Sequence, residues 1–355
     1  MSILFSPVTI RSLTFRNRLW VSPMCMYSAI DGVVQEWHHT HLAQFASGGA
    51  GLIVAEATAV VPEGRISPRD AGLWNDEQRD AWIPIVDAIH ARGAAAGIQL
   101  AHAGRKASTW WPWAAERGSV PEADGGWTTT APSAIAFDGF AEPTALDADG
   151  IEAVVEGFAS AARRALDAGF DVLEVHGAHG YLLHQFLSPL SNRREDEYGG
   201  SLENRARLLL RVVDSIRAVA GDGVPLFVRI SASDHAEGGF SPDEAATVGE
   251  WAAARGADLI DVSSGGLVAH QQISVFPGYQ VPLAETVRQG GRIPVSAVGL
   301  ITAAAQAEQV LAEGSADAVF AGREWLRDPH FALRAAHELG ADIAWPPQYE
   351  RAHWR

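Results

Sequence analysis

Short, almost continuously apolar runs recur along the whole chain, and stretches with helical periodicity separate them. Each run is rich in Val, Ile and Leu and shows little of the alternation typical of a half-exposed strand. A parallel strand needs such continuous hydrophobicity when both of its faces are buried. The pattern predicts eight strands, at Arg18–Ser22, Gly51–Thr58, Ala96–Ala101, Asp171–His176, Pro225–Ser231, Asp258–Ser263, Pro294–Val298 and Asp317–Ala321.

Helix start and stop signals mark the stretches between these strands. Ser241 stands before Pro242, as an N-cap before a proline in the first turn, and several stretches end at a glycine. Helices are predicted at Asp76–His90, Asp147–Ala168 and Thr302–Glu313, from Ser201 to Gly221, from Ser241 onward, and from Asp328 to Gly340.

The alternation of eight strands with eight helices predicts an α/β protein, a (β/α)₈ TIM barrel built as a single domain by residues 1–355. An open, doubly wound sheet is the alternative. That fold usually places G-x-G-x-x-G directly after a strand to bind phosphate, and no such motif follows a strand here. The closed barrel is therefore favoured.

Two segments lie outside the repeat. Residues 3–15 alternate like a small hairpin, which could cap one end of the barrel. Residues 103–143 form a long excursion after the third strand and contain four tryptophans, Trp110, Trp111, Trp113 and Trp127. Because long loops in compact domains are usually functional, we interpret the excursion as a lid, with a surface loop packed down by its indoles as the alternative.

The composition of the chain limits the kinds of molecule it can bind and the cellular compartment in which it is expected. The net charge of −16 argues against binding to nucleic acid or an anionic membrane. No apolar run approaches the roughly 18 residues of a membrane span, and residues 1–11 do not read as a signal peptide. Cys25 is the single cysteine, so the chain can form neither an internal disulfide nor a cysteine-ligated metal cluster. A cytoplasmic location is expected.

Polar residues stand where the predicted strands end, which in a TIM barrel is the catalytic face. They are Ser22 and Cys25 after the first strand, Gln99 on the third, and Arg229 on the fifth, with further polar or glycine positions after every other strand. Packing alone does not explain such a convergence, and we expect an active site at this rim.

The segment from His176 to Tyr181 carries the densest group of reactive side chains. Gly177 and Gly180 indicate that the chain has left the strand and turned, so both imidazoles can aim at one point. The pair could bind a metal, as in a barrel metallohydrolase, but a metal needs further ligands. We favour two N–H donors that hold a substrate oxygen, with the Tyr181 phenol as proton donor, and expect no metal.

Glycines and arginines at other strand ends suggest an anionic cofactor. Gly299 and Gly322-Arg323 follow the seventh and eighth strands, where this fold commonly binds a ligand phosphate. Arg229 brings a permanent charge to the rim. Taken alone it could be a core ion pair, but beside a phosphate site it suits a cofactor ring that becomes anionic on reduction.

Together these residues resemble the old yellow enzyme family of FMN-dependent ene-reductases, and specifically its bacterial subclass with an active-site cysteine. The similarity follows nearly the whole chain in order, as far as the tail Gln348-Tyr349-Glu350-Arg351. Matching stretches include Ser22-Pro23-Met24-Cys25-Met26-Tyr27, Glu56-Ala57-Thr58, Gln99-Leu100-Ala101-His102-Ala103-Gly104-Arg105-Lys106, His176 to Tyr181, Asp196-Glu197-Tyr198-Gly199-Gly200-Ser201 and Gly322-Arg323.

The resemblance implies a tightly bound, non-covalent FMN and NADPH or NADH as reductant. It implies that the enzyme reduces activated C=C bonds of α,β-unsaturated carbonyl or nitro compounds by a ping-pong mechanism. The implied flavin-binding residues are Ser22, Pro23, Met24, Cys25, Ala57, Gln99, Arg229, Gly299, Gly322 and Arg323.

The resemblance also assigns roles in the substrate site. His176 and His179 would bind the substrate oxygen, Tyr181 would donate the proton and Tyr27 would be a further contact. Cys25 would tune the flavin rather than act as a nucleophile, whereas the simpler reading is a small buried side chain.

In this subclass the tail enters a neighbouring subunit's site, so residues 341–355 would carry Arg351 into a second copy in a homodimer or homotetramer. An exposed basic C-terminus is the simpler alternative. The long excursion and the extra Ala352-His353 depart from the compact members of the subclass.

Overall fold

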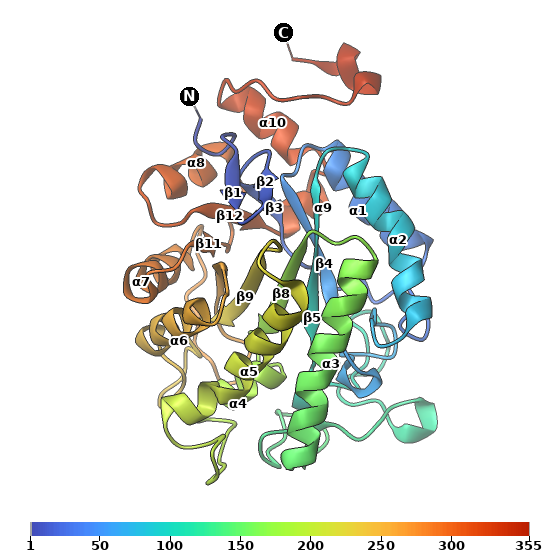
Figure 1. Ribbon diagram of the computed structural model, residues 1–355, viewed down its shortest axis with the longest axis vertical. Coiled ribbons are helices and arrows are strands. Elements are labelled where there is room, and N and C mark those ends of the chain that lie inside the picture. The colour runs from blue at the N-terminus through green and yellow to red at the C-terminus, as the bar shows by residue number, and fades with distance from the viewer. Residues whose placement is uncertain (1, 355) are drawn as a thin grey trace.

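The eight predicted strands close into one parallel barrel in the computed structural model, which describes residues 2–354 (Figure 1). The TIM-barrel prediction is confirmed, and the open sheet is excluded by the pairing of β12 with β3. Strand ends differ from the prediction by only a few residues. The barrel strands are β3 Leu19–Val21, β4 Leu52–Ala59, β5 Ala95–Ala101, β8 Val172–Gly177, β9 Leu226–Ser231, β10 Leu259–Ser263, β11 Val295–Ala297 and β12 Ala318–Ala321.

Helices surround this barrel, and side-chain caps fix where several of them begin. Asn75, Asp147, Ser201 and Ser241 each accept a hydrogen bond from a backbone N–H of the first turn. The helices are α1 Glu36–Ser47, α2 Asp76–His90, α3 Ala148–Asp167, α4 Leu182–Leu187, α5 Leu202–Ala220, α6 Pro242–Ala254, α7 Val281–Gly291, α8 Ala304–Ala312, α9 Arg323–Arg327 and α10 Phe331–Glu338.

The short helices α4 and α9 were not predicted, and three other helices differ from the sequence prediction for physical reasons. The last helix begins at Phe331, because the Asp328 carboxylate accepts the His330 N–H and holds the preceding residues outside it. Helix α1 was not delimited because His38 and His41 take buried positions on its inner face, which breaks the apolar stripe. Helix α7 was not delimited either. It starts with Val281-Pro282 and ends in two glycines, and this weakens the helical pattern in the sequence.

The barrel interior changes character from one end to the other. A hairpin, β1 Val8–Ile10 with β2 Leu13–Phe15, closes one end as predicted, although it is shorter than residues 3–15. Phe15 reaches into the lumen, where the rings of Trp20 and Phe227 stack 5.8 Å apart. Above this aromatic plug lies a buried polar layer, which consists of Gln99, Glu174, Arg229, Asp261 and Ser296.

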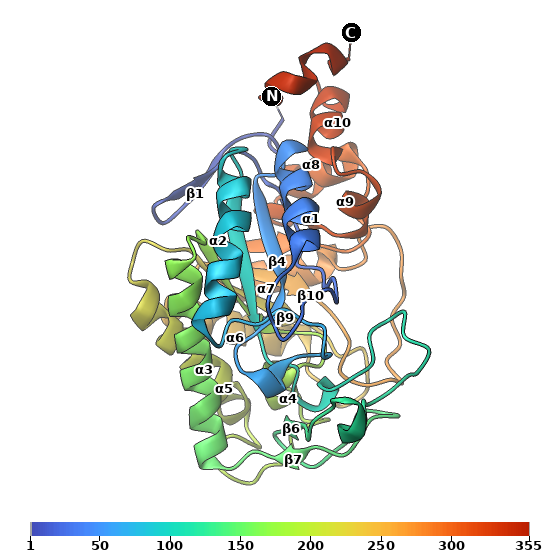
Figure 2. The same cartoon turned by 90° about the vertical axis from the view of Figure 1, so that its right-hand side faces the viewer.

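The excursion at residues 103–143 lies over the opposite end, beyond the carboxyl ends of the strands (Figure 2). It contains two short 3-10 turns, η2 Gly104–Lys106 and η3 Glu122–Asp124, and β6 Thr130–Ala131, which pairs with β7 Thr144–Ala145. The Arg65 guanidinium lies over the indoles of both Trp74 and Trp127, and Arg69 lies 3.9 Å from the Trp111 ring centroid. The excursion is therefore a folded segment anchored by cation–π contacts. A further turn, η1 Pro62–Gly64, supports it from below.

The C-terminal tail runs along the hairpin end of the molecule, away from the excursion (Figures 1 and 2). Its last turn, η4 Pro347–Ala352, is exposed, and Trp345 stacks on His353 at 4.2 Å between ring centroids. Of the helices formed by residues 2–354, none combines the length and hydropathy needed to cross a membrane.

Candidate active site

The predicted site residues gather at the carboxyl ends of the barrel strands. Cys25 and Tyr27 follow β3 and pack with Ala57 of β4 and with Tyr181 after β8 in one small apolar cluster. The side chains of Cys25, Tyr27 and Tyr181 are all half-buried rather than exposed. The structure therefore brings residues from three separate segments to one point, as the strand-end argument requires.

His176 and His179 form a pair at this point. Their ring centroids lie 5.2 Å apart with planes at 79°, and the Tyr181 ring lies 5.0 Å from that of His176. The turn that allows this geometry places His179 at φ +59°, a left-handed conformation, followed by Gly180 at +74°. The expected turn after the strand is present, and it directs both imidazoles toward the rim.

Both imidazoles are electrically neutral. Burial, followed by the charge of Arg229, lowers the pKa of His176 and of His179 well below the usual value. A neutral imidazole donates one N–H, so the pair can donate two. His179 Nε2 lies 2.7 Å from Ser263 Oγ, while the buried His176 Nδ1 has no partner within residues 2–354. An orphaned ring nitrogen at a rim is a position for a ligand atom.

The Tyr181 phenol and the Cys25 thiol both keep their protons. Burial raises the pKa of Tyr181 well above its usual value, and burial with nearby carboxylates raises the pKa of Cys25. A phenol held in its protonated form can donate to a more basic carbanion. A thiol held in its protonated form is a poor nucleophile, in line with the expectation that Cys25 does not attack the substrate.

Two interactions that support the histidine turn, residues 176–181, were not predicted from the sequence. Lys106 donates through Nζ to the carbonyl oxygens of His179 and Gly266, at 2.8 and 2.9 Å, and lies 5.2 Å from the Tyr181 ring centroid. Burial lowers the pKa of Lys106 to about 8. Lys106 stands in the matching stretch from Gln99 to Lys106, shortly after β5 ends. This position at the end of a barrel strand was the signal that could have identified it.

The second support is a buried histidine–aspartate pair. His184 Nδ1 accepts the Gly180 N–H at 2.9 Å, and His184 Nε2 lies 2.8 Å from Asp234 Oδ1, with both side chains fully buried. Since Nδ1 accepts, Nε2 carries the proton and donates it to Asp234. This pair fixes the turn between His179 and Tyr181.

A cavity of about 260 Å³ opens at the carboxyl ends of the barrel strands, and its wall includes Ser263, whose Oγ lies 2.7 Å from His179 Nε2. The wall holds seven of the ten residues expected to bind the flavin, whereas Cys25, Ala57 and Gln99 lie outside it. Ser22 Oγ and Arg229 Nε are buried there without a hydrogen-bond partner in the described chain. Gly299 has φ +120°, and a Cβ there would press on Gln280 and Tyr279. The predicted residues in the wall are Ser22, Pro23, Met24, Arg229, Gly299, Gly322 and Arg323.

These features fit an FMN. Unpartnered polar groups on the floor suit the polar edge of an isoalloxazine, and a glycine-lined end with the exposed Arg323 suits a phosphate. The alternative of Arg229 as a core ion pair holds in part, because its Nε lies 2.9 Å from Asp261 Oδ2, yet off the direction of a hydrogen bond. Arg229 therefore combines an ion pair with unused donor capacity.

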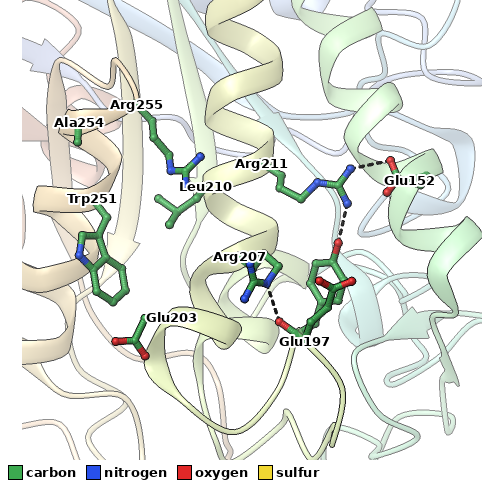
Figure 3. Close-up of a pocket in the computed structure, with 10 residues that line it drawn as sticks. Glu152, Glu197, Glu203, Arg207, Leu210, Arg211, Trp251, Ala254 and Arg255 are labelled. Carbon is green, nitrogen blue, oxygen red and sulfur yellow. Dashed lines mark hydrogen bonds and ion pairs between the residues drawn. The ribbon is translucent and has the colours of Figure 1, made fainter.

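A separate cavity of about 620 Å³ opens on the outer surface beside α5 and α6 (Figure 3). It is larger than the cavity at the rim, but its cations are already engaged. Arg211 donates to Glu152 and to the Tyr198 hydroxyl, both at 2.6 Å, and Arg207 donates to the Glu197 carbonyl. Neither its charges nor its position suits the chemistry expected at the strand ends.

The metal-binding alternative gains no support from the geometry. Across residues 2–354, no group of three or more His, Cys, Asp or Glu side chains is arranged to hold a metal ion. Arg351 lies in the exposed tail at the hairpin end, so the structure does not bring it to Tyr181 of the same subunit.

Comparison with known proteins identifies the family of the chain. Residues 3–342 match the model of the NADH:flavin oxidoreductase / NADH oxidase family. The chain is 49% identical over 351 residues to an NADPH dehydrogenase of Halalkalibacterium halodurans, covering 98% of both chains. Among solved structures, morphinone reductase aligns with a TM-score of 0.79 at 31% identity, covering 98% of this chain and 92% of that one. An old yellow enzyme homologue from Zymomonas mobilis aligns at 0.78 and 28%, covering 97% of both chains.

Proposed function

This chain belongs to the NADH:flavin oxidoreductase family, in its old yellow enzyme group, and we propose that it uses FMN and NADPH to reduce activated C=C bonds. Its general activity is that of an NADPH dehydrogenase. The observation that carries the finer proposal is the neutral His176–His179 pair beside the protonated phenol of Tyr181. Two N–H donors and one acid are what an α,β-unsaturated carbonyl substrate requires.

When bound, the flavin would accept hydride from the reductant and pass it to the β-carbon of the substrate. Arg229 would hold the negative charge at the pyrimidine edge, beside Ser22, Pro23 and Met24, which line the same cavity. The family resemblance adds Cys25, Ala57 and Gln99 to the flavin bed, although these three lie outside the lining of that cavity. Gly299, Gly322 and Arg323 would hold the phosphate. These assignments rest on unpartnered polar atoms and on a cavity with glycines at its end.

His176 and His179 would donate to the substrate oxygen as it gains negative charge, which polarises the double bond. Tyr181 would then protonate the α-carbon, and its phenolate would be reprotonated from solvent. Tyr27, which packs in the same apolar cluster as Tyr181, would be a further substrate contact. The cytoplasmic location stays a prediction.

The first test is flavin binding. Purified protein reconstituted with FMN is expected to be yellow, to oxidise NADPH and to pass the electrons to an enone such as cyclohexenone. Arg323→Ala removes a charge-assisted hydrogen bond to the phosphate, worth about 1.5–3 kcal/mol, and should weaken FMN binding roughly 10- to 100-fold. Arg207→Ala, in the outer cavity of Figure 3, is the control and should leave FMN binding unchanged. Protein that takes up no FMN would refute the proposed function.

We further propose that the excursion at residues 103–143 is a lid over the substrate. Trp113 is 60% exposed, yet its ring meets that of Tyr27 edge-on at 5.8 Å between centroids. An exposed indole beside a substrate contact offers a flat apolar wall to a bulky substrate. Trp113→Ala should raise KM for a phenyl-substituted enone roughly 2- to 10-fold, as an aromatic contact of 0.5–1.5 kcal/mol implies, and should not affect a small enone. An equal change in KM for both substrates would argue for the packed surface loop instead.

The tail is proposed to act in a neighbouring subunit of a homodimer or homotetramer. Because Arg351 lies at the hairpin end of its own barrel, it can serve a site only in another copy. Arg351→Ala and Tyr181→Phe subunits should each have low activity alone. Mixed oligomers should regain activity, because some sites combine an intact Tyr181 with the partner's intact tail. Mixtures with no more activity than the sum of their parts, at proven subunit exchange, would exclude this role for Arg351.

A further inference from the structure

The polar layer inside the barrel holds two carboxyl groups for one guanidinium. Glu174 of β8 and Asp261 of β10 are both fully buried, and Arg229 of β9 lies between their strands. The strand register places Arg229 directly opposite Asp261, and Gln99 directly opposite Glu174. If both carboxyl groups were ionised, the layer would carry one uncompensated negative charge in a medium of low polarity, which is costly.

The two carboxyl groups differ in their contacts: both oxygens of Asp261 have a partner, whereas only one oxygen of Glu174 does. Asp261 is the ion-pair partner, since Oδ2 lies 2.9 Å from Arg229 Nε and Oδ1 accepts from Ser296 Oγ at 2.8 Å. Glu174 accepts from Gln99 Nε2 at 2.7 Å through Oε1, while its Oε2 is buried with no partner in residues 2–354. Glu174 is therefore the group that a proton can occupy.

The polar layer meets the proposed flavin site at Arg229, while Gln99, Glu174, Asp261 and Ser296 lie outside the lining of the cavity. Arg229 lines the cavity at the rim, and His176 stands opposite Arg229 in the strand register. Reduction of a flavin by hydride adds two electrons and one proton, so its charge becomes more negative by one. The added negative charge would develop on the pyrimidine edge of the flavin, which Arg229 would contact. Arg229 also belongs to the polar layer that contains the unpartnered Oε2 of Glu174.

We propose, resting on the function proposed above, that in alkaline solution Glu174 is a carboxylate while the flavin is oxidised, takes up one proton from solvent when the flavin is reduced, and releases it on reoxidation. In the balanced step, the reductant gives a hydride and leaves oxidised, the flavin gains one negative charge, and Glu174 changes from carboxylate to carboxylic acid. The layer with its flavin thus keeps a constant total charge. Burial raises the pKa of Asp261 as well, but Asp261 stays ionised throughout because its two oxygens contact Arg229 and Ser296.

The surroundings of Glu174 support a proton affinity in the required range. Burial, followed by the charge of Asp261, raises the pKa of Glu174 to about 8, whereas Arg229 and the Gln99 hydrogen bond act in the opposite direction. A negative charge on the flavin would raise this pKa further. Below about pH 8 Glu174 is therefore protonated in both redox states, and above that pH the proton binds only on reduction.

The midpoint potential of the flavin as a function of pH tests this proposal. For a two-electron couple, each proton taken up contributes about 30 mV per tenfold change in proton concentration. The wild-type potential should fall by about 30 mV per pH unit below pH 8 and by about twice that above it. Glu174→Gln should show the single shallow slope throughout, because the amide cannot take the proton.

Two further variants make the outcome specific. Asp261→Asn should shift the break to lower pH, because the charge that raises the pKa of Glu174 is gone. Glu152→Gln, the same kind of change on the outer face of α3, should leave the break in place. Protonation of the flavin itself would instead steepen the slope at the acidic end, equally in wild type and Glu174→Gln.

Infrared titration of the flavin-free protein provides a second readout. A protonated-carboxyl band should be present at neutral pH, disappear with a midpoint near pH 8 and be missing in Glu174→Gln. If the holoenzyme is reduced by NADPH but the wild-type slope is uniform, the inference is wrong and the proposed function stands. If the protein binds no flavin, the proposed function fails first and this inference with it. Absence of the carboxyl band overturns the inference independently of flavin.

Discussion

Replacing His176 and His179 together by alanine is expected to lower kcat for an α,β-unsaturated ketone by at least about 10²-fold. That figure is the lower end of the cost of removing one oxyanion donor, which is roughly 10² to 10³. The rings of the two neutral imidazoles lie 5.2 Å apart between centroids, and the buried Nδ1 of His176 has no partner in residues 2–354. Without them the developing negative charge on the substrate oxygen has no donor. Oxidation of pre-reduced flavin by the ketone should be followed by stopped-flow.

Phenol binding gives this prediction a readout that does not depend on turnover. A phenolate bound to the histidine pair over an oxidised flavin should produce a charge-transfer band, which the double variant should lose. His176→Asn/His179→Asn retains N–H donors and should recover part of both signals. The flavin content of each variant must match wild type, since Arg229 and Arg323 are unchanged. A charge-transfer band that survives in the double alanine variant would contradict the donor-pair role.

Tyr181→Phe is expected to reduce the rate of enone reduction by roughly 10²- to 10⁴-fold, the usual contribution of a general acid. The phenol is held protonated by burial and stands 5.0 Å from the His176 ring. Reduction of the flavin by NADPH requires no such acid and should keep its rate. The two half-reactions should therefore be measured separately.

Tyr27→Phe is the matched control, because it also removes one hydroxyl from the same apolar cluster. It should affect substrate binding more than the rate of proton transfer. In Tyr181→Phe, the rate of nitroalkene reduction should fall less than the rate of enone reduction. The nitro oxygens stabilise the negative charge that remains on the substrate when the proton is not delivered. Equal losses for both substrates, or an equal loss in Tyr27→Phe, would remove Tyr181 from the role of acid.

The barrel and its rim were predictable because they depend on local signals. Continuous apolar runs identified all eight strands, and the rule that catalytic groups follow such strands placed Cys25, Gln99, Arg229 and the histidine turn on one face. Helix α1 was the main gap. Its buried histidines satisfy tertiary contacts, such as the 3.1 Å approach of His38 Nε2 to Glu56 Oε1, and periodicity alone does not register them.

The supporting residues were not predictable for a related reason. His184 and Asp234 are 50 residues apart in the sequence, and Glu174 looks like an ordinary polar position within a strand. Their roles depend on strand register and on the direction of a single side chain, which no local pattern fixes. Lys106 lay inside a recognised motif, but its contact with the His179 carbonyl depends on the course of the excursion.

The aromatic plug formed by Phe15, Trp20 and Phe227 has a consequence for how this enzyme can be engineered. It fills the lumen below the polar layer, so the barrel does not rely on that layer for its apolar packing. Exchange of Glu174 for its amide, which leaves the buried Arg229–Asp261 pair intact, should therefore change the electron affinity of the cofactor while the melting temperature changes little. Changes in the plug should do the reverse. The melting temperature and the electron affinity of the cofactor would thus depend on different residues along one barrel axis. Either property could be changed by substitution without altering the other.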